Sequence, residues 1–92
     1  MAAVSEIAVT PLGAGSFRVR VDEGASSTEH EVTVDPADLE RLGDGYASPE
    51  AFLRACFEFL LEREPKESIL QRFDVSVIGR YFPEFEERIR RA

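Results

Sequence analysis

The sequence predicts an α+β fold in which a three-stranded antiparallel meander is followed by three to four helices packed on one face of the sheet. Three observations support this class. Residues 6–34 contain runs that alternate between apolar and polar side chains, which is typical of half-buried strands. Two helix start signals follow, Asp35-Pro36 and Ser48-Pro49. From Phe52 onward, apolar residues recur at helical spacing, so the strands come first and the helices second.

The length of 92 residues predicts one domain that spans residues 1–92, with a frayed end at residues 1–4. Hydrophobic residues make up 43% of the chain and charged residues 32%, which indicates a folded rather than a disordered protein. The net charge is −7, and residues 1–49 carry nine acidic but only three basic side chains. Because so acidic a chain repels phosphate groups, we do not expect it to bind nucleic acid.

Cysteine usage and hydropathy indicate the compartment. The single cysteine, Cys56, cannot form an intramolecular disulfide, which favours a reducing environment. No stretch approaches the roughly 20 apolar residues of a membrane span, and the N-terminus lacks the basic-then-apolar pattern of a signal sequence. We therefore expect a cytoplasmic protein without a membrane partner.

Three segments carry the expected strands. Residues 6–10 and 17–21 alternate, and a loop with Pro and Gly over residues 11–15 separates them. A turn over residues 22–27 leads to the third alternating segment at residues 29–34. Because short connections favour antiparallel neighbours, these strands form a meander. On its polar face, opposite charges then meet in the pairs Arg18 with Glu31 and Arg20 with Glu29.

Start and stop signals define the first two helices. Asp35-Pro36 begins a helix that ends at Gly43-Asp44-Gly45, and Ser48-Pro49 begins the next one, which stops before Pro65. This second helix is expected to be the central buried helix because its apolar surface is broad. That surface consists of Phe52, Leu53, Cys56, Phe57, Phe59, Leu60 and Leu61. Beyond it, a further turn begins either at Pro65 or at a capping box that starts with Ser68. The residues that this turn adds to the expected core are Ile69, Leu70 and Phe73.

One apolar stripe organises residues 68–85 and continues beyond them. Its members recur at the spacing of one helix face: Ile78, Tyr81, Phe82, Phe85 and Ile89. Pro83 interrupts the stripe, because a proline inside a helix removes a hydrogen-bond donor and clashes with the preceding turn. We therefore expect two short helices, one over residues 74–82 and one over residues 83–91.

His30 lies in the densest polar cluster of the chain, close to Ser27 and Thr28. It shares a strand face with Val32 and Val34, which favours a hydrogen-bonded structural histidine at the core or its rim. In the alternative, Ser27, Thr28 and His30 form a small-ligand or catalytic site, because a serine together with a histidine suggests nucleophilic catalysis.

The remaining residue types offer little for catalysis. A single histidine excludes a metal site with two histidines, and Cys56 on the apolar face of the central helix is expected to behave as a small hydrophobe. Three glutamates at residues 84–87 resemble an acidic cluster, but adjacent helix residues point in different directions. The sequence has no glycine-rich phosphate loop, zinc-ligand spacing or calcium loop. We therefore expect no catalytic residue, no cofactor and no metal.

The break between the last two helices is a candidate surface for a protein partner. Arg80, Tyr81, Phe82 and Glu84 gather there, and Arg and Tyr are favoured in interface hot spots. A helix end also leaves backbone carbonyls available to a partner. In the alternative, Tyr81 and Phe82 both lie in the core, and Arg80 pairs with Glu84 one turn later.

Three segments carry a resemblance to known proteins: STEHEVTV, SPEAFLRACFEFLLEREPKESIL and FDVSVIGRYFPEFEERIRR. Together they resemble a small family of bacterial proteins that has no established activity, and the resemblance covers nearly the whole chain after Phe17. REPKESIL and SVIGRYFPE are its most specific parts. The resemblance implies a bacterial, cytoplasmic, single-domain protein and carries no functional residue. The order of strands and helices is also similar to antitoxin-like domains of the HicB type, at the level of the fold alone.

These observations lead to three functional hypotheses. The first is a protein-interaction module without catalytic activity, which binds a protein partner or a second copy of itself through a sheet edge or the Arg80–Phe85 break. The second is a small-ligand-binding protein or enzyme that uses Ser27, Thr28 and His30. The third is an antitoxin-like regulator. The small number of candidate catalytic residues and the open edges of a small sheet favour the protein-interaction module.

Overall fold

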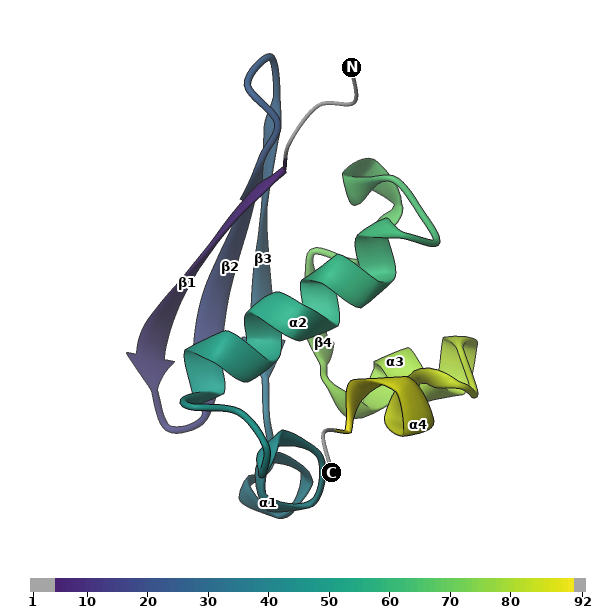
Figure 1. Cartoon of the computed structure of the whole chain (residues 1–92). Helices are drawn as coiled ribbons and strands as arrows, with labels where there is room; N and C mark the ends of the chain where they lie inside the picture. The colour runs from purple at the N-terminus through teal and green to yellow at the C-terminus, as the bar shows by residue number, and fades with distance from the viewer. Residues whose placement is uncertain (1–4, 91–92) are drawn as a thin grey trace.

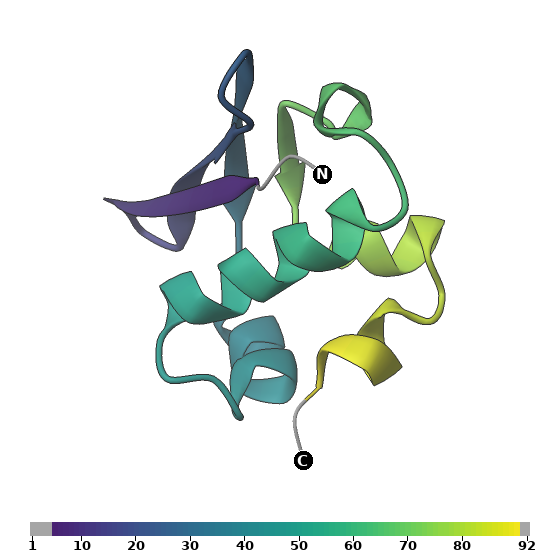
Figure 2. The ribbon, with the colours of Figure 1, turned by 45° about the horizontal axis from the view of Figure 1, so that its top comes forward.

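The computed structural model describes residues 5–90. Along these residues the elements are β1 Glu6–Gly13, β2 Ser16–Asp22, β3 Ser27–Thr33, α1 Pro36–Gly43, α2 Pro49–Leu61, the 3₁₀ turn η1 Lys66–Ser68, β4 Arg72–Asp74, α3 Ser76–Tyr81 and α4 Phe85–Ile89. Figure 1 shows α2 crossing in front of the sheet, with α1 below it and with α3 and α4 at its side. Figure 2 shows the same helices gathered on one side of the strands. The α+β class predicted from the sequence is confirmed.

The sheet has two unlike faces. Strands β1, β2 and β3 form the predicted antiparallel meander, and the predicted register of Arg18 opposite Glu31 and Arg20 opposite Glu29 is confirmed. The inner face packs against the helices through the buried side chains of Phe17, Val19, Val21 and Val32. On the outer face, Arg18 and Arg20 each approach Glu29 to 3.9 Å, and Glu31 lies 3.8 Å from Arg72. Such solvent-exposed pairs contribute about 0–1 kcal/mol each, so the outer face adds little to stability.

A fourth strand completes the sheet, so the prediction of three antiparallel strands was wrong in number. β4 lies parallel to β3 in the order β1-β2-β3-β4. The Glu31 N–H donates to the Gln71 carbonyl at 2.7 Å, and the Val75 N–H donates to the Thr33 carbonyl at 2.9 Å. A strand of three residues is too short to show an alternating pattern, and its partner is distant in the sequence. For both reasons, the pairing of residues 71–75 with β3 could not be predicted from the sequence pattern.

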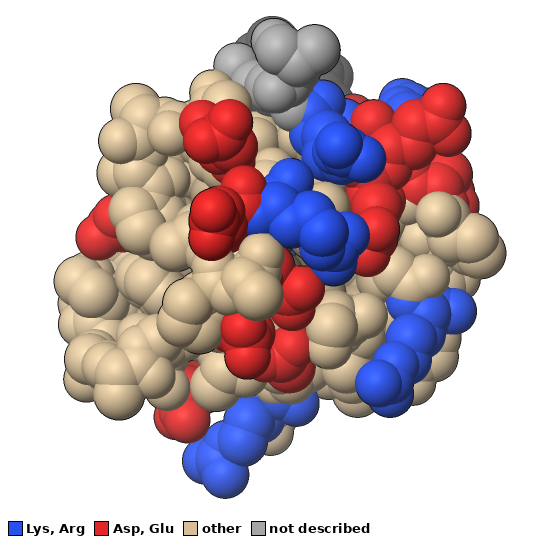
Figure 3. All heavy atoms as spheres, turned by 90° about the horizontal axis from the view of Figure 1, so that it is seen from below, with Lys and Arg blue, Asp and Glu red and all other residues tan. Residues whose placement is uncertain are grey.

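Strand β1 is longer than predicted because it accommodates Pro11. An edge strand tolerates proline, whose missing N–H can face away from the ladder. The turn that follows has positive φ values at Gly13 (96°), Ala14 (53°) and Gly15 (78°). Gly15 is also confined by its surroundings, since a Cβ there would lie 3.0 Å from the carbonyl oxygen of Val34. This β1–β2 turn carries no charged residue, and Figure 3 shows few charged side chains on that side of the molecule.

The start signals of α1 and α2 are confirmed. The Asp35 carboxylate accepts a hydrogen bond from the Ala37 N–H at 2.8 Å, and the Ser48 hydroxyl accepts one from the Ala51 N–H at 3.1 Å. Each helix has proline at its first position, as expected from the local sequence. α2 ends at Leu61 and is the central buried helix. Its buried residues are Phe52, Leu53, Cys56, Phe57, Phe59 and Leu60.

The two C-terminal helices are shorter than predicted. α3 begins at Ser76 rather than near Asp74, because Asp74 belongs to β4. The Asp74 carboxylate nevertheless accepts hydrogen bonds from the Ser76 N–H at 3.0 Å and the Ser76 hydroxyl at 2.7 Å, so it supports the helix start from one position further back. Pro83 lies in the turn between the helices, and α4 begins at Phe85. The predicted helix end at Arg91 lies outside the described residues.

The core is one cluster of buried apolar side chains between the inner face of the sheet and the helices. Its fully buried members are Val19, Val21, Val32, Phe52, Leu53, Cys56, Phe57, Val75 and Phe85. Within residues 5–90, no helix combines the length and the apolar character needed to cross a membrane. The prediction of a frayed end at residues 1–4 lies outside the described part of the chain.

Candidate functional site

An apolar groove of about 240 Å³ opens beside the end of α2, between the segment that leads into β4 and helix α3. It is lined by Leu60, Glu64, Ser68, Ile69, Leu70, Phe73, Val77, Ile78, Tyr81 and Phe82. The deeper side chains belong to the core, since Leu60, Ile69 and Ile78 are all buried. At the surface, Leu70 is 48% exposed and Tyr81 is 67% exposed. The groove therefore connects the core directly to solvent.

Lys66, the only lysine of the chain, holds the start of one groove wall. Its side chain is 3% exposed, and its ammonium group contacts the carboxylates of Glu67 and Glu23, the latter at 2.9 Å. Hydrogen bonds to Glu67 and Glu23 raise the pKa of Lys66, and the same bonds lower the pKa of both carboxyl groups. Because Glu23 follows β2, this contact ties η1 to the β2–β3 turn.

His30 fixes the same groove wall at Leu70. Its ring is 2% exposed and packs on Phe57 with the ring centroids 5.3 Å apart. Nδ1 lies 2.7 Å from the carbonyl oxygen of Leu70, and Nε2 lies 2.8 Å from the hydroxyl oxygen of Thr28. Since a carbonyl oxygen only accepts, Nδ1 donates to Leu70, and Nε2 shares a hydrogen bond with the Thr28 hydroxyl, which can donate or accept. The bond to Leu70 fixes the backbone of a residue at the groove's edge.

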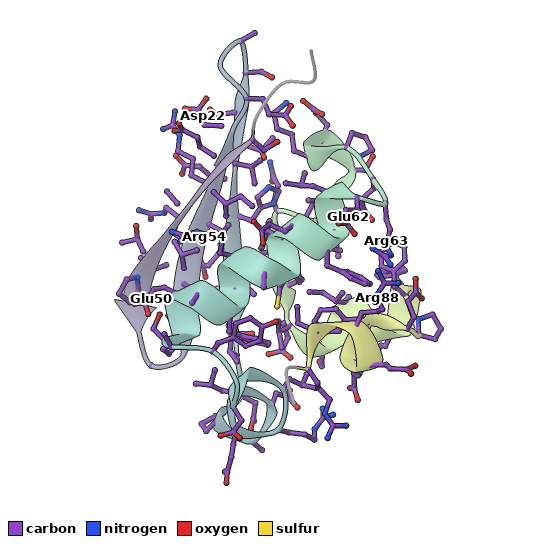
Figure 4. The ribbon with its side chains drawn as sticks, viewed as in Figure 1. Asp22, Glu50, Arg54, Glu62, Arg63 and Arg88 are labelled. Atoms are coloured by element: carbon purple, nitrogen blue, oxygen red, sulfur yellow. The ribbon has the colours of Figure 1, made fainter. Side chains whose placement is uncertain are left out.

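The opposite wall is tied to α2 by aromatic and charged contacts. The Phe82 ring meets the Phe59 ring edge to face, with centroids 6.0 Å apart. The guanidinium group of Arg63 lies 3.6 Å from the centroid of Phe59, and its Nε donates to Glu84 at 3.1 Å. Figure 4 shows Arg63 at the end of α2, on the side where α3 and α4 lie. These contacts hold the α3–α4 turn, and with it Phe82, against α2.

The four residues predicted to bind a partner are divided between two places. Tyr81 and Phe82 line the groove, Tyr81 at its edge and Phe82 packed in part against the core. Arg80 is exposed outside the lining and forms no ion pair with another described residue. Glu84 pairs with Arg63 on α2 instead of with Arg80. The alternative in which both aromatic residues are buried therefore does not hold, because Tyr81 faces solvent.

Ser27, Thr28 and His30 do not converge on one site. Thr28 and His30 lie on the inner face of β3 and bond to each other, whereas Ser27 is exposed on the outer face. Adjacent residues of a strand point to opposite faces, which separates the two hydroxyl groups. A shallow polar depression of about 410 Å³ is lined by Arg18, Glu29, His30, Glu31, Gln71 and Arg72. Both nitrogens of the histidine ring are bonded to protein groups, so neither faces this depression as a free base.

The described part of the chain contains neither a group of side chains that can bind a metal ion nor an exposed thiol. No three His, Cys, Asp or Glu side chains of residues 5–90 are grouped so that they can hold a metal ion. Cys56 is fully buried, and its burial raises the pKa of the thiol. A buried, protonated thiol is a poor nucleophile, so Cys56 acts as a packing residue.

Two groove residues, Leu70 and Glu64, had no assigned role at the site. Leu70 was expected in the core together with Ile69, but it is 48% exposed whereas Ile69 is 6% exposed. The backbone at Ile69 is extended, so neighbouring side chains point in opposite directions and only one of the two enters the core. An Ile-Leu pair in an extended segment is therefore the signal that predicts one exposed apolar residue.

Comparison of the chain with protein-family models, with curated proteins and with solved structures finds no match in any of the three. The resemblance to a small bacterial family stays a prediction. The functional conclusion therefore depends on the groove itself.

Proposed function

We propose that the protein is an interaction module that holds an apolar segment of a partner protein in the groove between the end of α2, residues 68–73 and α3. One observation carries this proposal. Three large hydrophobic side chains are exposed among the described residues, namely Leu12, Leu70 and Tyr81, and two of them flank the same groove. Exposed apolar side chains beside a concave apolar surface are typical of sites that bind a protein segment.

The size and chemistry of the groove favour a protein segment over a small molecule. Its volume of about 240 Å³ is below the roughly 300–1,000 Å³ of small-molecule clefts and suits one or two large apolar side chains. The polar side chains that line it are Glu64, Ser68 and Tyr81. Three such groups, on different segments of the lining, offer little to orient a polar metabolite.

The two open edges of the sheet are poorer binding surfaces than the groove. β1 contains Pro11, and its Ile7 carbonyl already accepts a hydrogen bond from Arg54 Nε at 3.3 Å. Figure 4 shows Arg54 on the side of α2 that lies over the strands. β4 has only three residues, and the Asp74 side chain is bonded to the Thr33 hydroxyl at 2.6 Å. Short or blocked edges resist pairing with another strand.

The charge of the chain favours a different protein over a second copy as the occupant. The net charge is −7, so two copies repel each other. Among the described residues that line the groove, Glu64 is the only charged one, and no lysine or arginine is present. A neutral or basic segment of a partner therefore meets no repulsion there, whereas an acidic segment does.

Peptide selection on the full chain tests this proposal. A random peptide library displayed on phage is panned on the immobilised protein, and enriched peptides are titrated against the protein in solution. The matched variants Tyr81→Ser and Leu12→Ser each remove one exposed apolar side chain, and each is expected to change the free energy of unfolding by no more than about 0.5 kcal/mol. We expect Tyr81→Ser to weaken peptide binding about tenfold or more, and Leu12→Ser to leave it unchanged.

Three results would overturn the proposal. The first is that no peptide is enriched above a selection without the protein. The second is that Tyr81→Ser binds the enriched peptides as tightly as the wild type. The third is a stable dimer of the wild type, detected by light scattering, that becomes monomeric in Tyr81→Ser. This result would show that the groove serves self-association instead.

A further inference from the structure

We infer that Glu64 selects partner segments that carry a lysine or arginine beside the apolar side chain held in the groove. This inference rests on the proposed function, because it concerns which segments the same groove accepts. It adds a chemical requirement that the apolar lining alone does not impose. The predicted ligand is therefore a short apolar and basic segment of another protein.

The position of Glu64 separates it from the acidic residues around it. Glu62 and Glu84 each pair with Arg63, and Glu67 pairs with Lys66. Glu64 is only partly exposed and lines the groove, yet its carboxylate has no hydrogen bond or ion pair with any described residue. Its neighbours have their charge compensated within the chain, and Glu64 does not.

An uncompensated carboxylate beside an apolar surface acts on binding in two ways. It attracts a cation, with a stronger effect than in open water because the apolar walls lower the local dielectric constant. It also repels an acidic residue in the same place, so it discriminates against acidic segments as well as favouring basic ones. We expect a basic residue to improve the dissociation constant about fivefold over a neutral one, the upper range for partly exposed ion pairs.

The geometry of α2 also limits where the basic residue lies in the partner. Glu64 lies just beyond the end of α2 at Leu61, but its N–H donates to the Leu60 carbonyl at 2.9 Å. The two residues therefore keep roughly the spacing of one helical turn, about 5–6 Å between their Cβ atoms. An extended segment advances about 3.4 Å per residue. A partner whose apolar side chain contacts Leu60 therefore places a basic residue near Glu64 when the two are about two residues apart.

The peptide selection is repeated with two variants of equal charge to test this inference. Glu64→Gln removes the carboxylate in the groove, whereas Glu58→Gln removes one on the exposed side of α2, outside the lining. Each enriched peptide is also made with its lysine or arginine replaced by glutamine. Titration of both peptides against all three proteins gives a double-mutant cycle, which isolates the interaction between Glu64 and the basic residue.

We expect basic residues to be enriched close to an apolar residue with the wild type and with Glu58→Gln, but not with Glu64→Gln. The basic peptide should bind the wild type about fivefold more tightly than its glutamine form, and this ratio should approach one in Glu64→Gln. Binding of the basic peptide to the wild type should also weaken as salt is raised.

Two contrary results have different meanings. In the first, peptides bind and Tyr81→Ser weakens their binding, but the affinity ratio of the basic peptide to its glutamine form is the same in Glu64→Gln and the wild type. The proposed role of Glu64 is then wrong, and the groove remains a binding site. If no peptide binds the wild type at all, both the role of Glu64 and the proposed function are wrong.

Discussion

The molecule exposes apolar side chains at two places that differ in what lies beneath them. At the β1–β2 turn, Leu12 is 42% exposed at the end of an edge strand, and the turn is uncharged. At the groove, Tyr81 and Leu70 are more exposed, and they stand beside a cavity lined by core residues. We propose a binding surface only at the groove, because the exposed apolar residues there adjoin a concave apolar surface, whereas Leu12 does not line the groove.

The two places are also held by different forces. The β1–β2 turn is fixed by the ladder of two adjacent strands, together with a backbone bond from the Val34 N–H to the Gly15 carbonyl at 2.8 Å. The groove walls depend on side chains that join distant parts of the chain, above all His30 and Lys66 on one side and Arg63 on the other. Substitutions at the groove's supports are therefore expected to change both stability and binding, whereas changes in the turn affect stability alone.

The largest expected effect is that of Phe59→Ala, which removes the ring against which Phe82 packs. Phe59 is 6% exposed and also meets Phe85 with the ring centroids 5.1 Å apart. We expect the free energy of unfolding to fall by about 3–5 kcal/mol, measured by urea denaturation. Ile7→Ala, in the half-buried part of β1, is the control and is expected to lower the free energy of unfolding by a smaller amount. Equal costs at the two positions would contradict the view that the groove is continuous with the core.

His30→Phe sharpens the comparison, because it keeps a ring against Phe57 but removes both hydrogen bonds of the imidazole. Loss of the bonds to Leu70 and Thr28 is expected to cost about 1–3 kcal/mol of stability and to weaken peptide binding, since Leu70 loses its backbone anchor. His30→Asn, which keeps a donor near the Leu70 carbonyl, is the matched control and should retain more of the binding. If both variants bind peptides like the wild type, His30 does not position the groove wall.

Acid should weaken the anchor at Lys66 before it affects the β1–β2 turn. The hydrogen bond to Lys66, together with one from Ser5, lowers the pKa of Glu23 below its ordinary value of 4.5. A lowered carboxyl pKa contributes stability above that ordinary value, and this stability is lost as the pH falls through the folded-state pKa. The stability difference between the wild type and Glu23→Gln is therefore expected to shrink between about pH 6 and about pH 3 in urea denaturation. A difference that stays constant over this range would show that the ion pair does not contribute.

The smallest expected effect is a gain of stability in the turn. Ala14 has a φ of 53°, in the left-handed region that glycine adopts without a Cβ penalty. Ala14→Gly should raise the free energy of unfolding by about 0.5–1 kcal/mol, after allowance for the greater freedom of glycine in the unfolded chain. Peptide affinity should not change, because the turn lies outside the groove. A loss of stability would show that the turn is not strained at this position.

The sequence predicts well those features that depend on neighbouring residues. Asp35 and Ser48 cap their helices through hydrogen bonds to residues two and three positions later, so the starts of α1 and α2 are visible locally. The alternation in β2 and β3 likewise defines their faces and register. Tyr81 and Phe82 were assigned to a candidate partner surface from their residue types and from the break at Pro83.

Features that depend on distant contacts were not predicted. β4 exists because residues 72–74 pair with residues 31–33, and no local pattern reveals that pairing. Leu70 turns outward because Ile69, its neighbour in an extended segment, enters the core while His30 holds the Leu70 carbonyl. Glu64 lines the groove because the chain after α2 turns back toward the sheet. The groove is formed by tertiary contacts, so its complete lining could not be read from periodicity.

Chemical-shift mapping tests the central claim most directly. The backbone amide spectrum of the isotope-labelled chain is recorded with and without the most strongly enriched peptide, and assigned shifts are placed on the structure. The account predicts that the largest changes fall at Leu70, Val77 and Tyr81, while the amides of Leu12 and Gly13 stay in place. Changes centred on the β1–β2 turn or on the outer face around Arg18, with Tyr81 unaffected, would contradict it.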